Sequence, residues 1–150
     1  MAINMRLASI CTVAVIALLV SANNLGRASA QSATNVKARY HYYNPEENHW
    51  SLDDAKASCA PYYDNQPLTW KKAYGWTAYC AASGPTGQAA CGKCLKVTNV
   101  KSGASKTVRI VDQCKRGDLS LDALVFRDLD TDHSGFVQGY ITVNYQFVSC

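Results

Sequence analysis

The sequence predicts one small, mainly β domain that closes into a barrel and is held together by disulfides. Three observations support this fold class: strand-like segments of four to eight residues dominate, helical segments are few and short, and six cysteines follow residue 30. After a leader of 30 residues, the remaining 120 residues are enough for one domain of ordinary size. The βαβ pattern of a parallel sheet is missing from the chain.

Residues 1–30 have the pattern of a secretory signal peptide. Arg6 precedes an apolar run over 7–20, and Ala28-Ser29-Ala30 matches a small-x-small cleavage site. The run is shorter than the ~18–20 residues that a membrane-spanning helix needs, so an uncleaved anchor is the weaker alternative. We expect cleavage after Ala30, secretion, and a folded domain over 31–150 whose six cysteines pair in an oxidising compartment.

The charge balance excludes several classes of function. The chain has 15 Lys and Arg against 11 Asp and Glu, and without the leader 13 basic residues remain, a formal charge of +2. Strong binding to nucleic acid through bulk charge requires a larger basic excess, so we expect no DNA partner. No basic amphipathic helix is predicted that would bind a membrane surface.

Four segments have the alternation or the β-branched composition of strands. In the last of them, apolar residues occupy every second position from Ile141 to Phe147. Lys101–Ala104 contains a glycine between two strand segments, which is typical of a hairpin turn. The predicted strands are 36–43, 95–98, 107–111 and 141–147.

Two short helices are predicted from capping patterns. Ser51 with Asp54 resembles a capping box that opens a helix over 52–59. Ser120 is the predicted N-cap of a second helix over 121–129, whose apolar residues share one face.

Two motifs resemble metal or redox sites but are interpreted as structural. Cys91-Gly92-Lys93-Cys94 is a C-x-x-C motif without a second ligand pair, so each cysteine is expected to pair with a distant one. Asp130–Gly135 resembles the start of a calcium loop, but Ile141 occupies the position of the essential Glu. We therefore expect an Asp-rich surface loop there, no metal ion and no cofactor.

A segment with interleaved aromatic residues and lysines is a candidate binding surface. Trp70, Lys71, Tyr74 and Trp76 combine flat rings, which stack on sugars or bases, with a cation that attracts phosphate. The alternative is that Trp70 and Trp76 are core anchors of adjacent strands. The pattern alone does not separate a glycan ligand from RNA.

His41 and Asp112 are the candidate acid/base pair. His41 lies in an aromatic strand, and Asp112 ends the strand over 107–111. An imidazole and a carboxylate that meet across a groove form a minimal general acid/base site. The alternative for His41 is a structural role.

Five blocks of sequence resemble the barwin domain, the plant pathogenesis-related class 4 family, and the match covers 31–150. The blocks are Tyr40–Pro45, Tyr74–Cys80, Gln88–Leu95, Val108–Cys114 and Val143–Val148. The resemblance implies a six-stranded double-psi β-barrel with a few short helices. It also implies three disulfides, Cys59–Cys91, Cys80–Cys114 and Cys94–Cys150.

The resemblance further implies a secreted plant defence protein with antifungal and antibacterial action. Its expected partner is fungal cell-wall polysaccharide, with weak binding to chitin oligosaccharides, and RNA is a further partner because several family members are ribonucleases. The chain is similar to the form without a hevein-type chitin-binding module, and we expect an apoplastic monomer.

The ribonuclease activity carries over only in part. The family's proposed catalytic residues match His41 and Asp112, but Tyr140 stands where a second histidine is usual. Tyrosine is a poor general acid at neutral pH because its reference pKa is near ~10, so we expect weak or absent cleavage of RNA. The rival hypotheses are a genuine endoribonuclease that uses His41 and Asp112, and a glycan-active barrel related to expansins or glycosidases.

Overall fold

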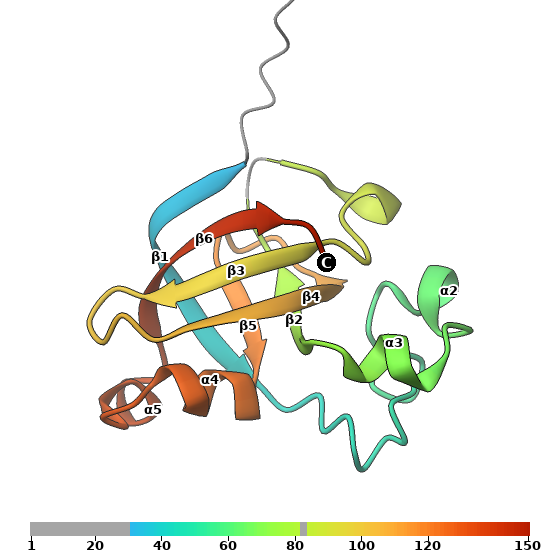
Figure 1. Cartoon of the computed structure of the whole chain (residues 1–150), viewed down its shortest axis with the longest axis horizontal. Coiled ribbons are helices and arrows are strands. Elements are labelled where there is room, and N and C mark those ends of the chain that lie inside the picture. Colours follow the sequence, from blue (N-terminus) through green and yellow to red (C-terminus); the bar gives the residue numbers. More distant parts are fainter. Residues whose placement is uncertain (1–30, 82–83) are drawn as a thin grey trace, which may run out of the picture.

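The computed structural model describes residues 31–81 and 84–150, so the predicted signal peptide lies outside the described residues. Six strands close into a barrel in the order β1-β5-β2-β4-β3-β6, which confirms the predicted fold class (Figure 1). The strands are β1 Ser32–His41, β2 Gly75–Tyr79, β3 Cys94–Asn99, β4 Ser105–Gln113, β5 Leu119–Asp122 and β6 Ile141–Val148.

Two of the six strand pairs are parallel, β1 with β5 and β2 with β4, and the other four are antiparallel. The predicted hairpin over Lys101–Ala104 joins β3 to β4, with Thr98 opposite Ser105. Gly103 has a φ of 73° and donates its N–H to the carbonyl of Asn99, so this turn needs a residue without a Cβ.

The alternating residues of the strands fill the barrel. Ile141, Val143 and Tyr145 are buried as the period of two predicts, while Phe147 is half-buried near the end of β6. One end of the barrel is closed by the helix α4 (Ala123–Leu129), which contributes Phe126 and Leu129 to the same core.

The predicted helix over 52–59 is wrong. Ser51 Oγ does accept the N–H of Asp54 at 3.1 Å, but the segment forms turns, and Lys56 has a left-handed φ of 55°. Its apolar residues Leu52 and Ala57 instead pack into a second core cluster outside the barrel. The helices of this region are α2 (Ala60–Tyr63) and α3 (Leu68–Lys72).

The second predicted helix is shorter than expected at its start. Residues 119–122 form β5, because Leu119 and Leu121 alternate into the core, and α4 begins only at Ala123. Asp122 rather than Ser120 is the N-cap, since its side chain accepts the N–H of Leu124 at 3.0 Å.

The loop that resembles a calcium site is closed by hydrogen bonds from its own backbone N–H groups to the side chain of Asp130. The carboxylate of Asp130 accepts the N–H groups of Gly135 and Phe136 at 2.9 and 2.7 Å, at the start of α5 (Ser134–Gln138). Asp130 is buried at 2 % exposure, so it does not lie on the surface as expected, whereas Asp132 is exposed.

The three disulfides join Cys59 to Cys91, Cys80 to Cys114 and Cys94 to Cys150, which is the pairing that the resemblance implies. Both cysteines of the C-x-x-C motif therefore pair with distant partners. The single-turn 3-10 helix η2 (Gly87–Ala89) precedes this motif. Within the described part of the chain, none of the helices is both long and apolar enough to cross a membrane.

Candidate functional site

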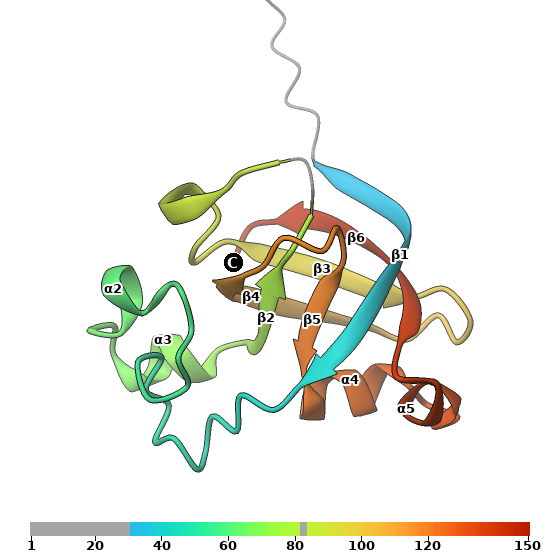
Figure 2. The ribbon, with the colours of Figure 1, turned by 180° about the vertical axis from the view of Figure 1, so that it is seen from behind.

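The outer face of β1 and β5 carries His41 together with several other polar side chains. The two strands run parallel with Arg39 opposite Ser120 and His41 opposite Asp122, and Figure 2 shows them side by side on the near side. Side chains alternate along strands, so these four residues share one face, while Leu119 and Leu121 point into the core. We call this outer face the polar wall; it comprises Lys37, Arg39, His41, Asp118, Ser120 and Asp122.

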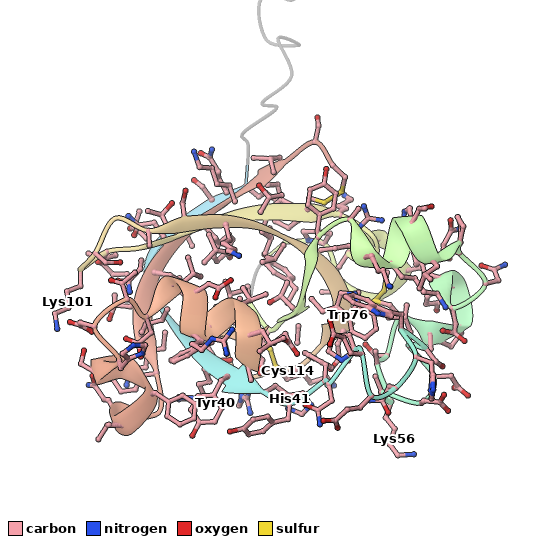
Figure 3. The ribbon with its side chains drawn as sticks, turned by 60° about the horizontal axis from the view of Figure 1, so that its bottom comes forward. Tyr40, His41, Lys56, Trp76, Lys101 and Cys114 are labelled. Carbon is pink, nitrogen blue, oxygen red and sulfur yellow. A yellow bond between two sulfur atoms is a disulfide. The ribbon has the colours of Figure 1, made fainter. Side chains whose placement is uncertain are left out.

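Tyr43 connects the two members of the predicted acid/base pair. The ring of His41 lies 4.4 Å from that of Tyr43, and the Tyr43 hydroxyl donates to Asp112 Oδ2 at 2.9 Å. Tyr43 is buried, whereas His41 is exposed at the end of β1 (Figure 3). The structure thus brings His41 and Asp112 into one region, with a buried phenol between them.

Asp112 has the contacts of a positioning residue. Its Oδ1 accepts the backbone N–H groups of Ser58 and Gln113 at 2.9 and 2.8 Å, and its Oδ2 accepts the Tyr43 hydroxyl. Burial, and then the charge of Asp112, raise the pKa of Tyr43 far above its usual value, so the phenol remains a donor. The carboxylate therefore holds the segments around residues 43 and 58 against β4.

Asp122 is a carboxyl group near His41 that the sequence analysis missed. It is 4 % exposed, and burial raises its pKa, although the backbone N–H of Leu124 and that of Tyr43 favour the charged form. The alternation of Leu119 to Asp122 carries a strand signal, but the pattern from Ser120 onward predicts an N-cap and a helix over 121–129 instead. In the pairing of β1 with β5, Asp122 lies opposite His41. Asp112 lies on β4, which is not a neighbour of β1 in the barrel.

Tyr140 lies just before β6, beside the polar wall. The register of β1 with β6 pairs Ala38 with Ile141, which places Tyr140 level with Arg39, two residues before His41 in β1. Lys37 Nζ lies 4.5 Å from the centre of the Tyr140 ring. Within residues 31–81 and 84–150, no hydrogen bond directly joins His41, Asp112 and Tyr140.

Trp76 is a core residue, which confirms the structural alternative for this side chain and corrects its assignment to a binding surface. It is 1 % exposed, and its indole N–H donates to the carbonyl of Lys71 at 3.0 Å. Its ring packs with Tyr43 and Leu52 in the second core cluster. It therefore presents no ring face to a ligand.

The rest of the predicted aromatic binding segment is also engaged inside the protein. One face of Trp70 stacks on Tyr63 at 5.2 Å, and the guanidinium of Arg109 lies 3.7 Å from the Trp70 ring centre. Tyr74 lies 5.0 Å from the same guanidinium. Lys71 forms an ion pair of 3.0 Å with Asp64. This cluster fastens the α2–α3 region to β4, and it leaves Trp70 half-buried, with Tyr63 and Arg109 against its ring.

A different set of aromatic side chains is exposed at the end of β1. Tyr42 is 59 % exposed and Phe136 45 % exposed. Tyr40 stacks on Phe136 at 4.7 Å and meets the edge of Tyr42 at 5.7 Å. Tyr42 and Phe136, with Leu124, line an open pocket of about 480 Å³. We call Tyr40, Tyr42, Leu124 and Phe136 the aromatic ledge; Tyr40 and Tyr42 flank His41 in the chain.

One cluster in the described part of the chain has potential metal-ligand atoms that lie within 4.8 Å of one another. It consists of Cys80, Cys114 and Asp118. The two sulfurs are joined in a disulfide, and Asp118 pairs with Arg39 and Arg116. This cluster is therefore a structural feature, because a disulfide offers no thiolate to a metal.

The family model for the Barwin family matches residues 32–150. The chain belongs to the Barwin family. The model spans every strand of the barrel and all three disulfides. Its N-terminal limit lies one residue after the start of the predicted mature domain at Gln31.

Solved structures similar to this Barwin-family chain include cerato-platanin 3 and cerato-platanin 2 from M. perniciosa. Cerato-platanin 3 is 18% identical with a TM-score of 0.57, and the match covers 79% of this chain and 95% of that one. Cerato-platanin 2 is 16% identical with a TM-score of 0.56, and the match again covers 79% of this chain and 95% of that one. At these identities the likeness concerns the fold, a double-psi β-barrel.

A point mutant of Clavibacter michiganensis expansin, solved in complex with cellohexaose, is also similar. It is 25% identical with a TM-score of 0.55, and the match covers 79% of this chain but 50% of the expansin. This chain therefore spans about half the length of the expansin that it matches.

Proposed function

We propose that this protein is a secreted defence protein that binds cell-wall polysaccharide, with chitin oligosaccharides as weak ligands. The observation that carries the proposal is the aromatic ledge, where Tyr42 and Phe136 are exposed and Tyr42 follows His41 of the polar wall in the chain. Family membership and the similarity to an expansin solved with cellohexaose support a glycan ligand.

The chemistry of the two surfaces suits a sugar chain. Aromatic rings stack on the apolar faces of pyranoses, and the accessible side chains of the polar wall, Lys37, Arg39 and His41, offer hydrogen-bond donors to hydroxyl groups. The pocket at the ledge is open rather than enclosed, so little of a ligand is desolvated and binding is expected to be weak.

Three disulfides favour folding in an oxidising compartment. Together with the predicted signal peptide over 1–30, they support secretion to the apoplast. We propose that the mature protein is a monomer over 31–150 that acts against fungi and bacteria at the wall.

Replacing Tyr42 with alanine should weaken binding to a chitin or cellulose oligosaccharide by roughly 5- to 10-fold, because one stacking ring contributes ~1–1.5 kcal/mol. Isothermal titration calorimetry with chitohexaose and cellohexaose measures this change. Tyr62→Ala is the matched control, since Tyr62 is 44 % exposed on α2 and lies outside the ledge. Equal affinity in wild type and Tyr42→Ala would remove the ledge from the proposal.

Ribonuclease activity is the second candidate function, and the exposed His41 is the observation that favours it. Lys37 and Arg39 lie on the same side of β1 as His41 and supply positive charge for a phosphate. In this candidate function His41 is the base that deprotonates a 2′-hydroxyl, and Asp112, by its contacts, is a positioning residue. The missing partner is an efficient general acid, since Tyr140 replaces the usual histidine.

His41→Ala should reduce any cleavage of RNA by ~100-fold or more, and Tyr140→His should increase it, because proton transfer groups contribute 10²–10⁴-fold. Cleavage of a fluorogenic oligoribonucleotide by purified protein provides the measurement, with Tyr140→Phe as the control for packing. If His41→Ala retains full activity, the activity comes from a contaminant or another site.

A further inference from the structure

Two arginines converge on one buried carboxylate of the polar wall. Arg39 Nε lies 3.1 Å from Oδ2 of Asp118, and Arg116 Nε lies 3.4 Å from Oδ1 of the same side chain. Asp118 is 5 % exposed, whereas the side chains of Arg39 and Arg116 are 39% and 54% exposed. The buried carboxylate thus holds two guanidinium groups in place at the surface.

Each arginine contacts Asp118 through its Nε atom. Among residues 31–81 and 84–150, no hydrogen bond or ion pair engages the terminal Nη atoms of Arg39 or Arg116. A guanidinium presents its terminal N–H groups as a planar fork that matches a carboxylate in a bidentate pair. Two such forks are therefore oriented by the protein and available to an anion.

Lys37 adds a third positive charge. The register that pairs Ala38 with Leu119 places Lys37 level with Asp118, and Lys37 is exposed. The ammonium of Lys37 lies over the Tyr140 ring rather than on the carboxylate. Lys37, Arg39 and Arg116 together outnumber the Asp118 carboxylate by two positive charges at this end of the polar wall. That excess attracts an anionic group from solution.

We propose that Arg39, Arg116 and Asp118 form an arginine clamp for a carboxylate carried by the polysaccharide, so that the ligand is an acidic, uronate-containing glycan. This inference rests on the proposed function and specifies its ligand. The neutral sugars of such a chain would lie on the aromatic ledge, while one uronate carboxylate pairs with the clamp.

The observations favour an isolated carboxylate over a chain of phosphates. RNA carries a charge on every nucleotide, and its binding requires a stripe of cations. The polar wall instead includes the carboxyl groups of Asp118 and Asp122, and residues 31–150 have a formal charge of only +2. A single clamp suits a polymer with carboxylates spaced among neutral sugars.

The test compares two probes that differ only in charge, a partly methyl-esterified galacturonate hexamer and the same hexamer fully esterified. Calorimetry should show roughly tenfold tighter binding of the charged probe, and Arg39→Gln and Arg116→Gln should each remove about that factor. Arg39→Lys should also weaken binding, because an ammonium lacks the fork. Lys96→Gln, on β3 across the barrel from β5, is the control for loss of one charge and should change nothing.

Equal affinity for both hexamers, with both weakened by Tyr42→Ala, would overturn the clamp and leave the proposed function intact. Binding of neither hexamer nor of chitohexaose would overturn both. Arg39-dependent binding of RNA without binding of the charged hexamer would overturn the clamp in favour of the second candidate function. Thermal unfolding checks the fold of each variant, and Arg116→Gln keeps the test decisive if Arg39→Gln unfolds.

Discussion

Trp76→Ala should lower the free energy of unfolding by about 3–5 kcal/mol, which is the cost of truncating a buried aromatic residue and leaving a cavity. Trp76 is 1 % exposed and joins the second core cluster to the barrel, with Tyr43 and Trp50 packed edge-on against its ring. Urea unfolding followed by far-ultraviolet circular dichroism measures the change without relying on tryptophan fluorescence.

The matched control for this loss is Tyr62→Ala, which removes an exposed ring and should change stability by no more than ~0.5 kcal/mol. The folded fraction of Trp76→Ala, selected at low temperature, should bind glycan like wild type. A stable Trp76→Ala protein that has lost glycan binding would show instead that Trp76 contacts the ligand.

Asp112→Ala should destabilise the protein by about 2–4 kcal/mol. The substitution leaves the buried Tyr43 hydroxyl and the N–H groups of Ser58 and Gln113 without their acceptor, and each lost partner costs ~1–3 kcal/mol, less where water reaches it. Asp112→Asn keeps one oxygen acceptor in place of two and should lose less. Urea unfolding of both variants at neutral pH provides the measurement.

Asp128→Ala is the control for Asp112→Ala, because Asp128 is exposed and its ion pair with Lys106 lies on the surface. It should leave stability nearly unchanged. If Asp112→Ala matches this control in stability yet abolishes cleavage of RNA, then Asp112 acts in the chemistry rather than in positioning Tyr43.

The strands were predictable because their signal is local. The alternation from Ile141 to Phe147 fixes which side chains face the core, and Gly103 marks the hairpin whatever the rest of the chain does. The exceptions are β2 and β5, which none of the predicted strands covers. In β5 only four residues alternate before α4 begins, so the apolar face of the helix dominates the pattern.

The location of the site was harder to predict because it depends on contacts between distant segments. The aromatic residues around Trp70 have the composition of a binding surface, and only the fold shows that Tyr63 and Arg109 cover that ring. Conversely, the pairing of β1 with β5 places Asp122 opposite His41 and lets Asp118 form an ion pair with Arg39. The spacing of these residues in the sequence indicates neither contact.

We propose that a polysaccharide binds at the aromatic ledge and the polar wall. Titrating chitohexaose into ¹⁵N-labelled protein, and following backbone amide shifts by nuclear magnetic resonance, locates the binding surface. Binding there should concentrate the shifts at His41, Tyr42, Leu124 and Phe136. Shifts confined to the segment around Trp70 and Tyr74, with the end of β1 unchanged, would contradict it.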